Sequence, residues 1–131
     1  MPAKSAGTPT LPGLACGVVW NSANGAVSVA PSPVARRINA AAMSPYQEFR
    51  ELQLEHLHQI LALNIKALTE LCYLFLPHML AHGQPSHVVN VGSVGGYAPL
   101  PNFAVYSGSK HYVRIFSNIL RHEYRGSNIR I

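Results

Sequence analysis

The feature that most constrains the fold is an apolar strand with a long helical repeat on each side of it. The strand spans residues 87–92 and reads HVVNVG, without the regular alternation of a half-exposed strand. Continuous apolar strands are typical of parallel sheets, which are covered on both faces. Parallel strands also need long crossover connections, and the helical repeats can supply them. The sequence therefore predicts an α/β fold with a parallel sheet.

Prolines, glycines and a serine set the expected bounds of the other elements. The first helix is expected from Pro45 to about residue 76, because Ser44 suits an N-cap before a proline at the first helical position. Pro77 should kink or end this helix, and Gly83 should stop the segment after it. The remaining expected elements are a second helix over residues 105–125 and short strands at residues 17–20, 26–30 and 129–131.

Tyr106 and Lys110 form a candidate catalytic pair. They lie four residues apart in the segment YSGSK, so on a helix they occupy the same face. A phenol alone is a poor proton donor or acceptor at neutral pH, and a neighbouring ammonium favours its ionised form. A hydroxyl such as that of Ser93, if the fold places it nearby, can hold a carbonyl or alcohol oxygen in line. This trio suits proton transfer to an oxygen while a hydride moves at the carbon.

The residues around this pair resemble the catalytic segment of the short-chain dehydrogenase/reductase family. In that family an apolar strand ends in a serine, a loop with small residues follows, and Tyr-x-x-x-Lys opens a long helix. The likeness covers roughly residues 46–131, and the helix before the strand carries Asn64 and Leu76-Pro77 at the family's positions. The other matching positions are Val88 to Val91, Ser93, Gly95, Gly96, Tyr106, Lys110, Phe116, Ser117, Leu120 and Glu123.

This resemblance implies part of a Rossmann-like, doubly wound parallel sheet and a reversible NAD(P)-dependent carbonyl/alcohol conversion on a small molecule. It implies that Tyr106 is the acid/base, and that Lys110 tunes Tyr106 and binds the nicotinamide ribose beside it. Ser93 would orient the substrate oxygen, and Asn64 would support the proton relay. Full-length members of the family make dimer contacts through the two helices. We therefore expect a homo-oligomer that associates through the helices of residues 46–76 and 105–125.

Segments with which the family holds its dinucleotide are not found in the sequence. Residues 1–60 lack the glycine-rich turn T-G-x-x-x-G-x-G, the N-N-A-G segment before Asn64 is absent, and the chain contains no Asp. The sequence ends at Ile131, before any P-G-x-x-x-T stretch. We therefore expect NAD or NADP binding by this chain to be weak or absent. The alternative hypothesis is a catalytically inactive fragment that acts as an oligomerisation or interaction module.

Residues 1–45 differ in composition from the rest of the chain. They are rich in Ala, Pro, Ser and Gly, and they contain no acidic residue. Such a composition predicts a low-complexity, irregular and disordered extension. A transit peptide is the alternative interpretation. Residues 46–131 are then expected to form the catalytic part of the domain.

The remaining residue patterns exclude several other classes of site and partner. Cys16 and Cys72 lie in dissimilar segments, which indicates no disulfide framework and favours a reducing, cytoplasmic location. His78 and His82 have the spacing of a metal pair but lack a third ligand, so no metal site is expected. No membrane span is expected, because no stretch of eighteen residues is free of polar interruptions. The net charge is +5, yet few aromatic residues accompany the arginines, so no nucleic-acid partner is expected.

Overall fold

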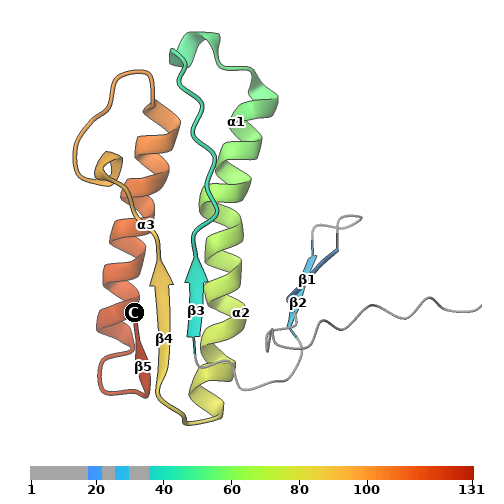
Figure 1. The fold of residues 1–131 in the computed structure, drawn as a ribbon, viewed down its shortest axis with the longest axis vertical. Coiled ribbons are helices and arrows are strands. Elements are labelled where there is room, and N and C mark those ends of the chain that lie inside the picture. Colours follow the sequence, from blue (N-terminus) through green and yellow to red (C-terminus); the bar gives the residue numbers. More distant parts are fainter. Residues whose placement is uncertain (1–17, 22–25, 30–35) are drawn as a thin grey trace, which may run out of the picture. The chain divides into compact units, whose positions relative to one another are not determined.

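The computed structural model describes residues 18–21, 26–29 and 36–131, and the chain divides into two compact units, residues 1–32 and 33–131 (Figure 1). The first unit contains a two-stranded antiparallel sheet. Its strands are β1 (Val18–Asn21) and β2 (Ala26–Val29), with Val18 opposite Val29 and Asn21 opposite Ala26. Strands were expected near both positions. The irregular structure expected for the rest of residues 1–35 lies outside the described residues.

The second unit is built on a three-stranded parallel sheet in the order β3-β4-β5. The strands are β3 (Arg36–Asn39), β4 (Ser86–Asn90) and β5 (Ile129–Arg130). Arg36 pairs with His87, which in turn pairs with Arg130. The parallel α/β arrangement that the sequence predicts is therefore confirmed. The strand order and the crossover helices are those of part of a doubly wound sheet.

Two long helical segments connect the strands and cover one face of the sheet (Figure 1). The first is continuous through α1 (Leu54–Leu61), the π-helical stretch η2 (Ala62–Ala67) and α2 (Leu68–Ala81). Gly83, with φ of 67°, follows its C-cap and permits the turn towards β4. The second, α3 (Ala104–Glu123), follows the short 3-10 turn η3 (Val94–Gly96).

The core lies between these helices and the covered face of the sheet. Phe75 and Met79 of α2 have no exposed surface, and Ile60 of α1 and Val113 of α3 are each 1% exposed. Val88 of β4 and Ile129 of β5 face the same interior. The opposite face is open within residues 36–131, where Ile38 and Val89 are 65% and 50% exposed.

The strand β3 corrects the prediction that residues 1–45 form an irregular extension. Its sequence, RRIN, contains a single apolar residue and so has no strand pattern of its own. Pairing with β4 supplies the hydrogen bonds that local sequence does not indicate. Asn39 is the last residue of this strand, and Ala40 follows it.

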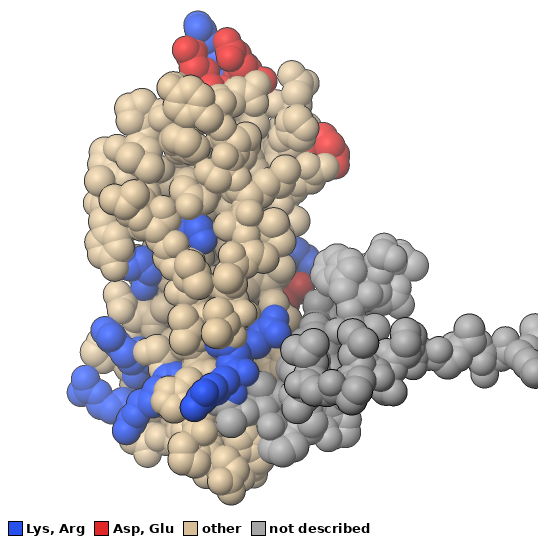
Figure 2. All heavy atoms as spheres, in the orientation of Figure 1, with Lys and Arg blue, Asp and Glu red and all other residues tan. Residues whose placement is uncertain are grey.

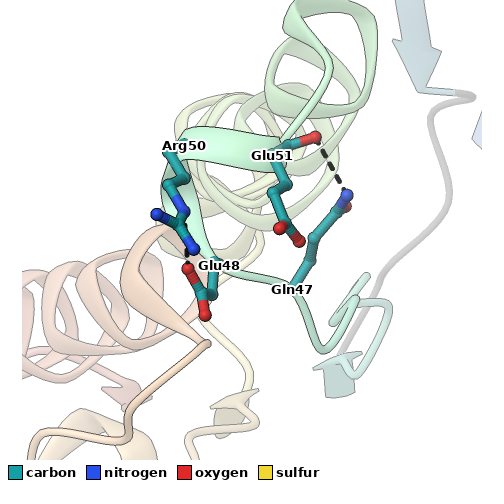
Figure 3. Close-up of polar contacts among 4 residues, drawn as sticks. All are labelled: Gln47, Glu48, Arg50 and Glu51. Carbon is teal, nitrogen blue, oxygen red and sulfur yellow. Dashed lines mark hydrogen bonds and ion pairs between the residues drawn. The ribbon is translucent and has the colours of Figure 1, made fainter.

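The first helix begins later than predicted, at Leu54 and not at Pro45. Before it, η1 (Phe49–Glu51) forms a separate turn. The amide of Gln47 donates to the Asn102 carbonyl at 3.0 Å, which ties this segment to the loop before α3. Figure 3 shows the contacts that close the turn: Gln47 Nε2 donates to the Glu51 carbonyl at 2.9 Å, and Arg50 pairs with Glu48 at 2.8 Å. These tertiary and local contacts override the N-cap signal.

Pro77 does not end the helix, which continues to Ala81. A proline leaves the carbonyl four residues earlier without its helical partner. That carbonyl belongs to Tyr73, whose side chain is 78% exposed, so water can reach this side of the helix. Of the two outcomes predicted for Pro77, a kink or an end of the helix, the end does not occur.

The helix Leu54–Ala81 is long and apolar enough to cross a membrane, by length and composition alone. Polar side chains nevertheless interrupt every stretch of eighteen residues in it, as expected from the sequence. A core helix of a soluble protein passes the same test, and this helix packs Ile60, Phe75 and Met79 against the sheet and α3. Within the described unit, 33% of its most apolar stretch is buried.

Candidate functional site

The candidate site lies where β4 ends and α3 begins. The chain leaves β4 at Asn90, passes through Ser93 into η3, and returns as α3 with Tyr106 in its first turn. In Figure 1 this is the end of the sheet towards which the arrows of β3 and β4 point. Open parallel α/β sheets bind their ligands outside the carboxyl ends of the strands. The location is therefore that of a ligand site in this class of fold.

Lys110 carries a buried positive charge at this position. The residue is only 4% exposed, and its Nζ donates to the Val91 carbonyl at 2.9 Å. The same nitrogen lies 5.9 Å from the centroid of the Tyr106 ring. An ammonium has three donors, and Val91 is the one acceptor found for it among the described residues. Two of its three N–H donors therefore have no acceptor among the described residues.

The Tyr106 ring is held by aromatic neighbours as well as by Lys110. It lies 5.9 Å from the Phe103 ring, centroid to centroid, at an angle of 58°. Phe103 in turn meets Tyr46 edge-on at 5.3 Å. Tyr106 is half-buried, so its ring is restrained while one side stays accessible. This combination suits a group that exchanges a proton with a bound molecule.

Ser93 stands at the N-cap of η3, with its Oγ accepting from the Gly95 amide at 3.2 Å. Its hydroxyl proton remains available to donate to another oxygen. The turn is seated on α3: a Cβ at Gly95 would lie 3.5 Å from the Tyr106 ring, and one at Gly96 only 2.8 Å from the Lys110 carbonyl. The structure thus brings the segment of Ser93 against the helix of Tyr106 and Lys110.

Asn64 is 2% exposed and lies within the π-helical stretch η2. Its Oδ1 accepts from the Met43 amide at 2.8 Å, and its Nδ2 donates to the Met43 carbonyl at 2.9 Å and to Ser109 Oγ at 3.0 Å. Ser109 Oγ then donates to the Tyr106 carbonyl at 2.7 Å. The Asn64 side chain thus joins the loop after β3 to the first turn of α3.

Ser109 is the residue of this site that sequence reasoning missed. It is 1% exposed and links Asn64 to the backbone of Tyr106. A serine can donate to the carbonyl three residues before it, which is a recognisable local signal. The segment YSGSK contains two serines, however, and Ser107 Oγ is also buried but has no partner among the described residues. The local pattern does not distinguish them.

A second polar network lies beneath the site, between the sheet and the helices. Arg37 Nε donates to Asn39 Oδ1 at 3.0 Å, and Asn39 Nδ2 donates to Asn90 Oδ1 at 2.7 Å. Asn90 Nδ2 continues the network to Ser117 Oγ of α3 at 2.9 Å. Asn90 directly precedes the carbonyl of Val91 that holds Lys110. The network therefore ties β3, β4 and α3 together immediately below the buried ammonium.

Cys72 lies beside this network, with its Sγ 3.7 Å from Asn39 Nδ2 and 3.8 Å from Asn90 Nδ2. Burial raises the pKa of its thiol, and the hydrogen bond from Asn90 and the charge of Arg37 only partly oppose this. Cys72 is a buried free thiol. Among residues 36–131 no group of three His, Cys or acidic side chains is placed to hold a metal ion.

Comparisons with known proteins match most of the chain. The sequence model of the short chain dehydrogenase family matches residues 25–131, beginning upstream of the likeness read from the sequence. Sulfoacetaldehyde reductase 2 of Chromohalobacter salexigens is 33% identical over 90 residues, which cover 69% of this chain and 35% of that protein.

Solved structures also match most of the chain. A serine dehydrogenase complexed with NADP+ superposes with a TM-score of 0.71 at 26% identity, covering 76% of this chain and 40% of that one. A 3-ketoacyl-(acyl-carrier-protein) reductase from Brucella melitensis complexed with NADH gives a TM-score of 0.70 at 26% identity, covering 75% and 42%. The chain spans well under half of the length of each of these relatives.

Proposed function

Because the chain belongs to the short chain dehydrogenase family, we propose that its site carries out a nicotinamide-dependent interconversion of a carbonyl and an alcohol. The observation that carries this proposal is the buried ammonium of Lys110, held by the Val91 carbonyl at 2.9 Å and lying 5.9 Å from the Tyr106 ring. Burying a charge is costly unless it is paired or used. Here it stands next to a half-exposed phenol at the carboxyl end of a parallel strand.

In this proposal the side chains of Tyr106, Lys110 and Ser93 act directly at the substrate, and each has its own role. Tyr106 gives a proton to the substrate oxygen during reduction and takes one back during oxidation. Lys110, whose Nζ lies 5.9 Å from the Tyr106 ring, stabilises through its charge the negative charge that develops on the phenol oxygen as the proton leaves. Ser93 donates a hydrogen bond to the same substrate oxygen and so fixes its position. Asn64 acts indirectly, because its side chain is occupied by Met43 and Ser109 and holds the start of α3 in place.

The residues present fit one end of a nicotinamide dinucleotide. Tyr106 and the two remaining donors of Lys110 can bind ribose hydroxyls, and the solved relatives named above contain NADP+ or NADH. The cofactor, when bound, supplies or accepts the hydride. No glycine-rich spacing for the pyrophosphate occurs in residues 1–60. The fit is therefore to the nicotinamide and its ribose, and not to the adenosine end.

Substrate reduction by the purified chain tests the proposal. NADH, NADPH and reduced nicotinamide mononucleotide are each supplied with a panel of small aldehydes and ketones, and loss of the reduced nicotinamide is followed. Tyr106→Phe should lower kcat by at least about 100-fold, because it removes the proton and keeps the ring. Lys110→Ala should lower kcat and weaken cofactor binding together. Tyr73→Phe, on an exposed position of α2, is the matched control and should be unchanged.

Two results would contradict the proposal. Retention of more than a few per cent of kcat by Tyr106→Phe would mean that another group is the acid. Absence of turnover with every cofactor, by a correctly folded chain, would favour the alternative of an inactive interaction module. The exposed apolar side chains of α3, Ile115 at 47% and Ile119 at 51%, are the observation that keeps this alternative open.

A further inference from the structure

Asn102 adopts a left-handed backbone conformation in the loop just before α3. Its φ is 64°, and among the described residues it is the only one besides glycine with a positive φ. This conformation is disfavoured for residues that carry a Cβ, although Asn tolerates it better than most. A residue keeps such a conformation where surrounding contacts hold it, and these positions cluster at functional sites. Tyr106 follows Asn102 by four residues, in the first turn of α3.

Two hydrogen bonds tie Asn102 to the segment that precedes η1. Its carbonyl accepts from the Gln47 amide at 3.0 Å, and its Nδ2 donates to the Tyr46 hydroxyl at 2.8 Å. Tyr46 lies 56 positions earlier in the chain, so these bonds are tertiary contacts. The main chain and the side chain of Asn102 are therefore held by the same neighbouring segment.

Phe103 carries this constraint from Asn102 to Tyr106. As the N-cap residue of α3, it accepts through its carbonyl from the Ser107 amide at 2.7 Å. Its ring meets the Tyr46 ring edge-on at 5.3 Å and lies 5.9 Å from the Tyr106 ring, centroid to centroid. The backbone direction at Asn102 therefore decides where the Phe103 ring lies, and this ring is a direct neighbour of the candidate acid/base.

Little free space remains between these two segments. Pro45, Phe49, Phe103 and Tyr106 are among the residues that line a cavity of about 10 Å³ between them. That volume is at the lower limit for a single water molecule. Because close-packed groups transmit displacement to their neighbours, a shift of the Phe103 ring reaches the Tyr106 ring.

We propose that Asn102 is a positioning residue for Tyr106, an inference that rests on the proton-transfer function proposed above. Its left-handed backbone and its bond to Tyr46 place the Phe103 ring, and this ring limits the orientations in which the Tyr106 hydroxyl meets the substrate oxygen. Proton transfer requires the two oxygens at hydrogen-bond distance and in line, and a small misplacement lowers the rate strongly. Asn102 acts through Phe103 and not through contact with the substrate.

Three substitutions separate the backbone of Asn102 from its side chain. Asn102→Ala strains the left-handed backbone and removes the bond to Tyr46, whereas Asn102→Gly and Tyr46→Phe each remove only that bond. We expect Asn102→Ala to lower kcat for carbonyl reduction by at least about fivefold, with substrate KM changed by less than about twofold. Asn102→Gly and Tyr46→Phe should give smaller and equal losses of kcat. Their double variant should lose no more than either alone, because both remove the same bond.

Phe103→Leu tests whether Asn102 acts through this ring. Phe103→Leu should lower kcat at least as much as Asn102→Ala does. Adding Asn102→Ala to Phe103→Leu should cause less than about twofold further loss, because the ring that Asn102 places is already missing.

Nuclear magnetic resonance reads the Tyr106 ring without any turnover. The chain contains six tyrosines, and with isotope-labelled tyrosine rings the Tyr106 signal is identified by its loss in Tyr106→Phe. In Phe103→Leu this signal should shift, because the neighbouring ring is removed, and in Asn102→Ala it should move towards the same position. An inactive parent chain that shows these shifts would count against the proposed function and not against the effect of Asn102 on Tyr106.

Phe116→Leu is the matched control. Phe116 is half-buried on the same helix and stacks on Tyr112 at 5.4 Å, so this variant loses an aromatic contact further along α3. It should shift the Tyr112 signal, leave the Tyr106 signal in place and change kcat by less than about twofold.

If Asn102→Ala does not fold by circular dichroism, Asn102→Gly and Tyr46→Phe decide by the same two measurements. Two results would overturn the proposal. One is a Tyr106 signal that keeps its parent position in the Asn102 variants. The other is an equal loss of kcat in Phe116→Leu and Phe103→Leu, which would show that any lost aromatic contact on α3 has this effect.

Discussion

Lys110 is the most deeply buried charged residue among the described residues, and it contacts two groups of the candidate site. One of its donors is used by the Val91 carbonyl, and its charge lies beside the Tyr106 ring. The neighbouring polar residues are satisfied in turn, because Asn64 and Ser109 bond to each other and to backbone groups. Buried polar groups are stable only when they are paired in this way. Single substitutions here should therefore have large effects.

Asn64→Ala should lower the free energy of unfolding by about 2–4 kcal/mol, because the Met43 amide and carbonyl and Ser109 lose their partner in a buried position. Chemical denaturation followed by circular dichroism measures the change. Asn118→Ala, at an exposed position of α3, is the control and should stay within about 0.5 kcal/mol of the parent. A loss for Asn64→Ala no larger than that of the control would show that this bridge does not stabilise the fold.

Cys72 should make stability depend on pH in the alkaline range. Burial raises the pKa of its thiol, so above the ordinary thiol pKa of about 8.5 the unfolded chain loses this proton before the folded chain does. The unfolding free energy should therefore fall as pH rises from that point towards the folded-state pKa. Denaturation curves at several pH values, for the parent and for Cys72→Ala, isolate the effect. A parent slope equal to that of Cys72→Ala would contradict it.

The close seating of η3 on α3 is the contact between elements that positions the candidate site. Gly95 and Gly96 are buried, and they let the turn after Ser93 approach the backbone of α3 at Lys110. The loop after β3 reaches the same helix through Asn64 and Ser109. Two connections from the carboxyl end of the sheet therefore converge on one helical turn. The positions of Ser93, Tyr106 and Lys110 relative to one another therefore depend on how closely η3 and the loop after β3 pack against α3.

Gly96→Ala should destabilise the unit by about 1–3 kcal/mol, because its Cβ would lie 2.8 Å from the Lys110 carbonyl and must push the turn away. Gly92→Ala is the matched control, since a Cβ there meets nothing within 4 Å. Thermal unfolding measures both variants, and the Gly96 variant should melt at the lower temperature. Equal melting temperatures would show that the turn can move away from α3 without loss of stability.

At the scale of the whole molecule, the described unit has a covered and an open face. Helices bury one face of the three-stranded sheet, and apolar side chains remain exposed on the other face and on the outer sides of the helices. The charge is also unevenly distributed: Figure 2 shows acidic side chains gathered at one end of the unit, and Lys and Arg side chains gathered over the other. The affinity of this chain for cofactors and for other chains depends on these exposed surfaces and on this distribution of charge.

NADH and NADPH should bind this chain weakly, with dissociation constants above the micromolar range. The residues present fit the nicotinamide ribose, and no glycine-rich turn provides backbone amides for the pyrophosphate. Calorimetric titration measures the affinity. Reduced nicotinamide mononucleotide, which lacks the adenosine half, should bind within about tenfold of NADH. A micromolar constant for either dinucleotide would imply about 8 kcal/mol of binding from residues not identified above.

The chain should self-associate through its helices. Ile115 and Ile119 of α3 are 47% and 51% exposed, and Leu54 and Tyr73 of the first helical segment are 66% and 78% exposed. Exposed apolar stripes of this kind mark interaction surfaces. Light scattering after gel filtration should report a mass above that of one chain, and Ile115→Glu with Ile119→Glu should lower it. A monomer at every concentration would contradict this expectation.

The sequence by itself determined the class of fold, the two helical segments, the strand at β4 and the candidate pair Tyr106 and Lys110. These are features of local periodicity and short motifs, which nearby residues encode. Only the tertiary structure decided that β3 is a strand, because its pattern depends on pairing with β4. It also decided that Asn64 bonds to Met43 and Ser109, which lie 21 and 45 residues away along the chain. Contacts between residues so far apart in the chain produce no repeating pattern in the sequence, because they form only when whole helices, strands and loops pack against one another.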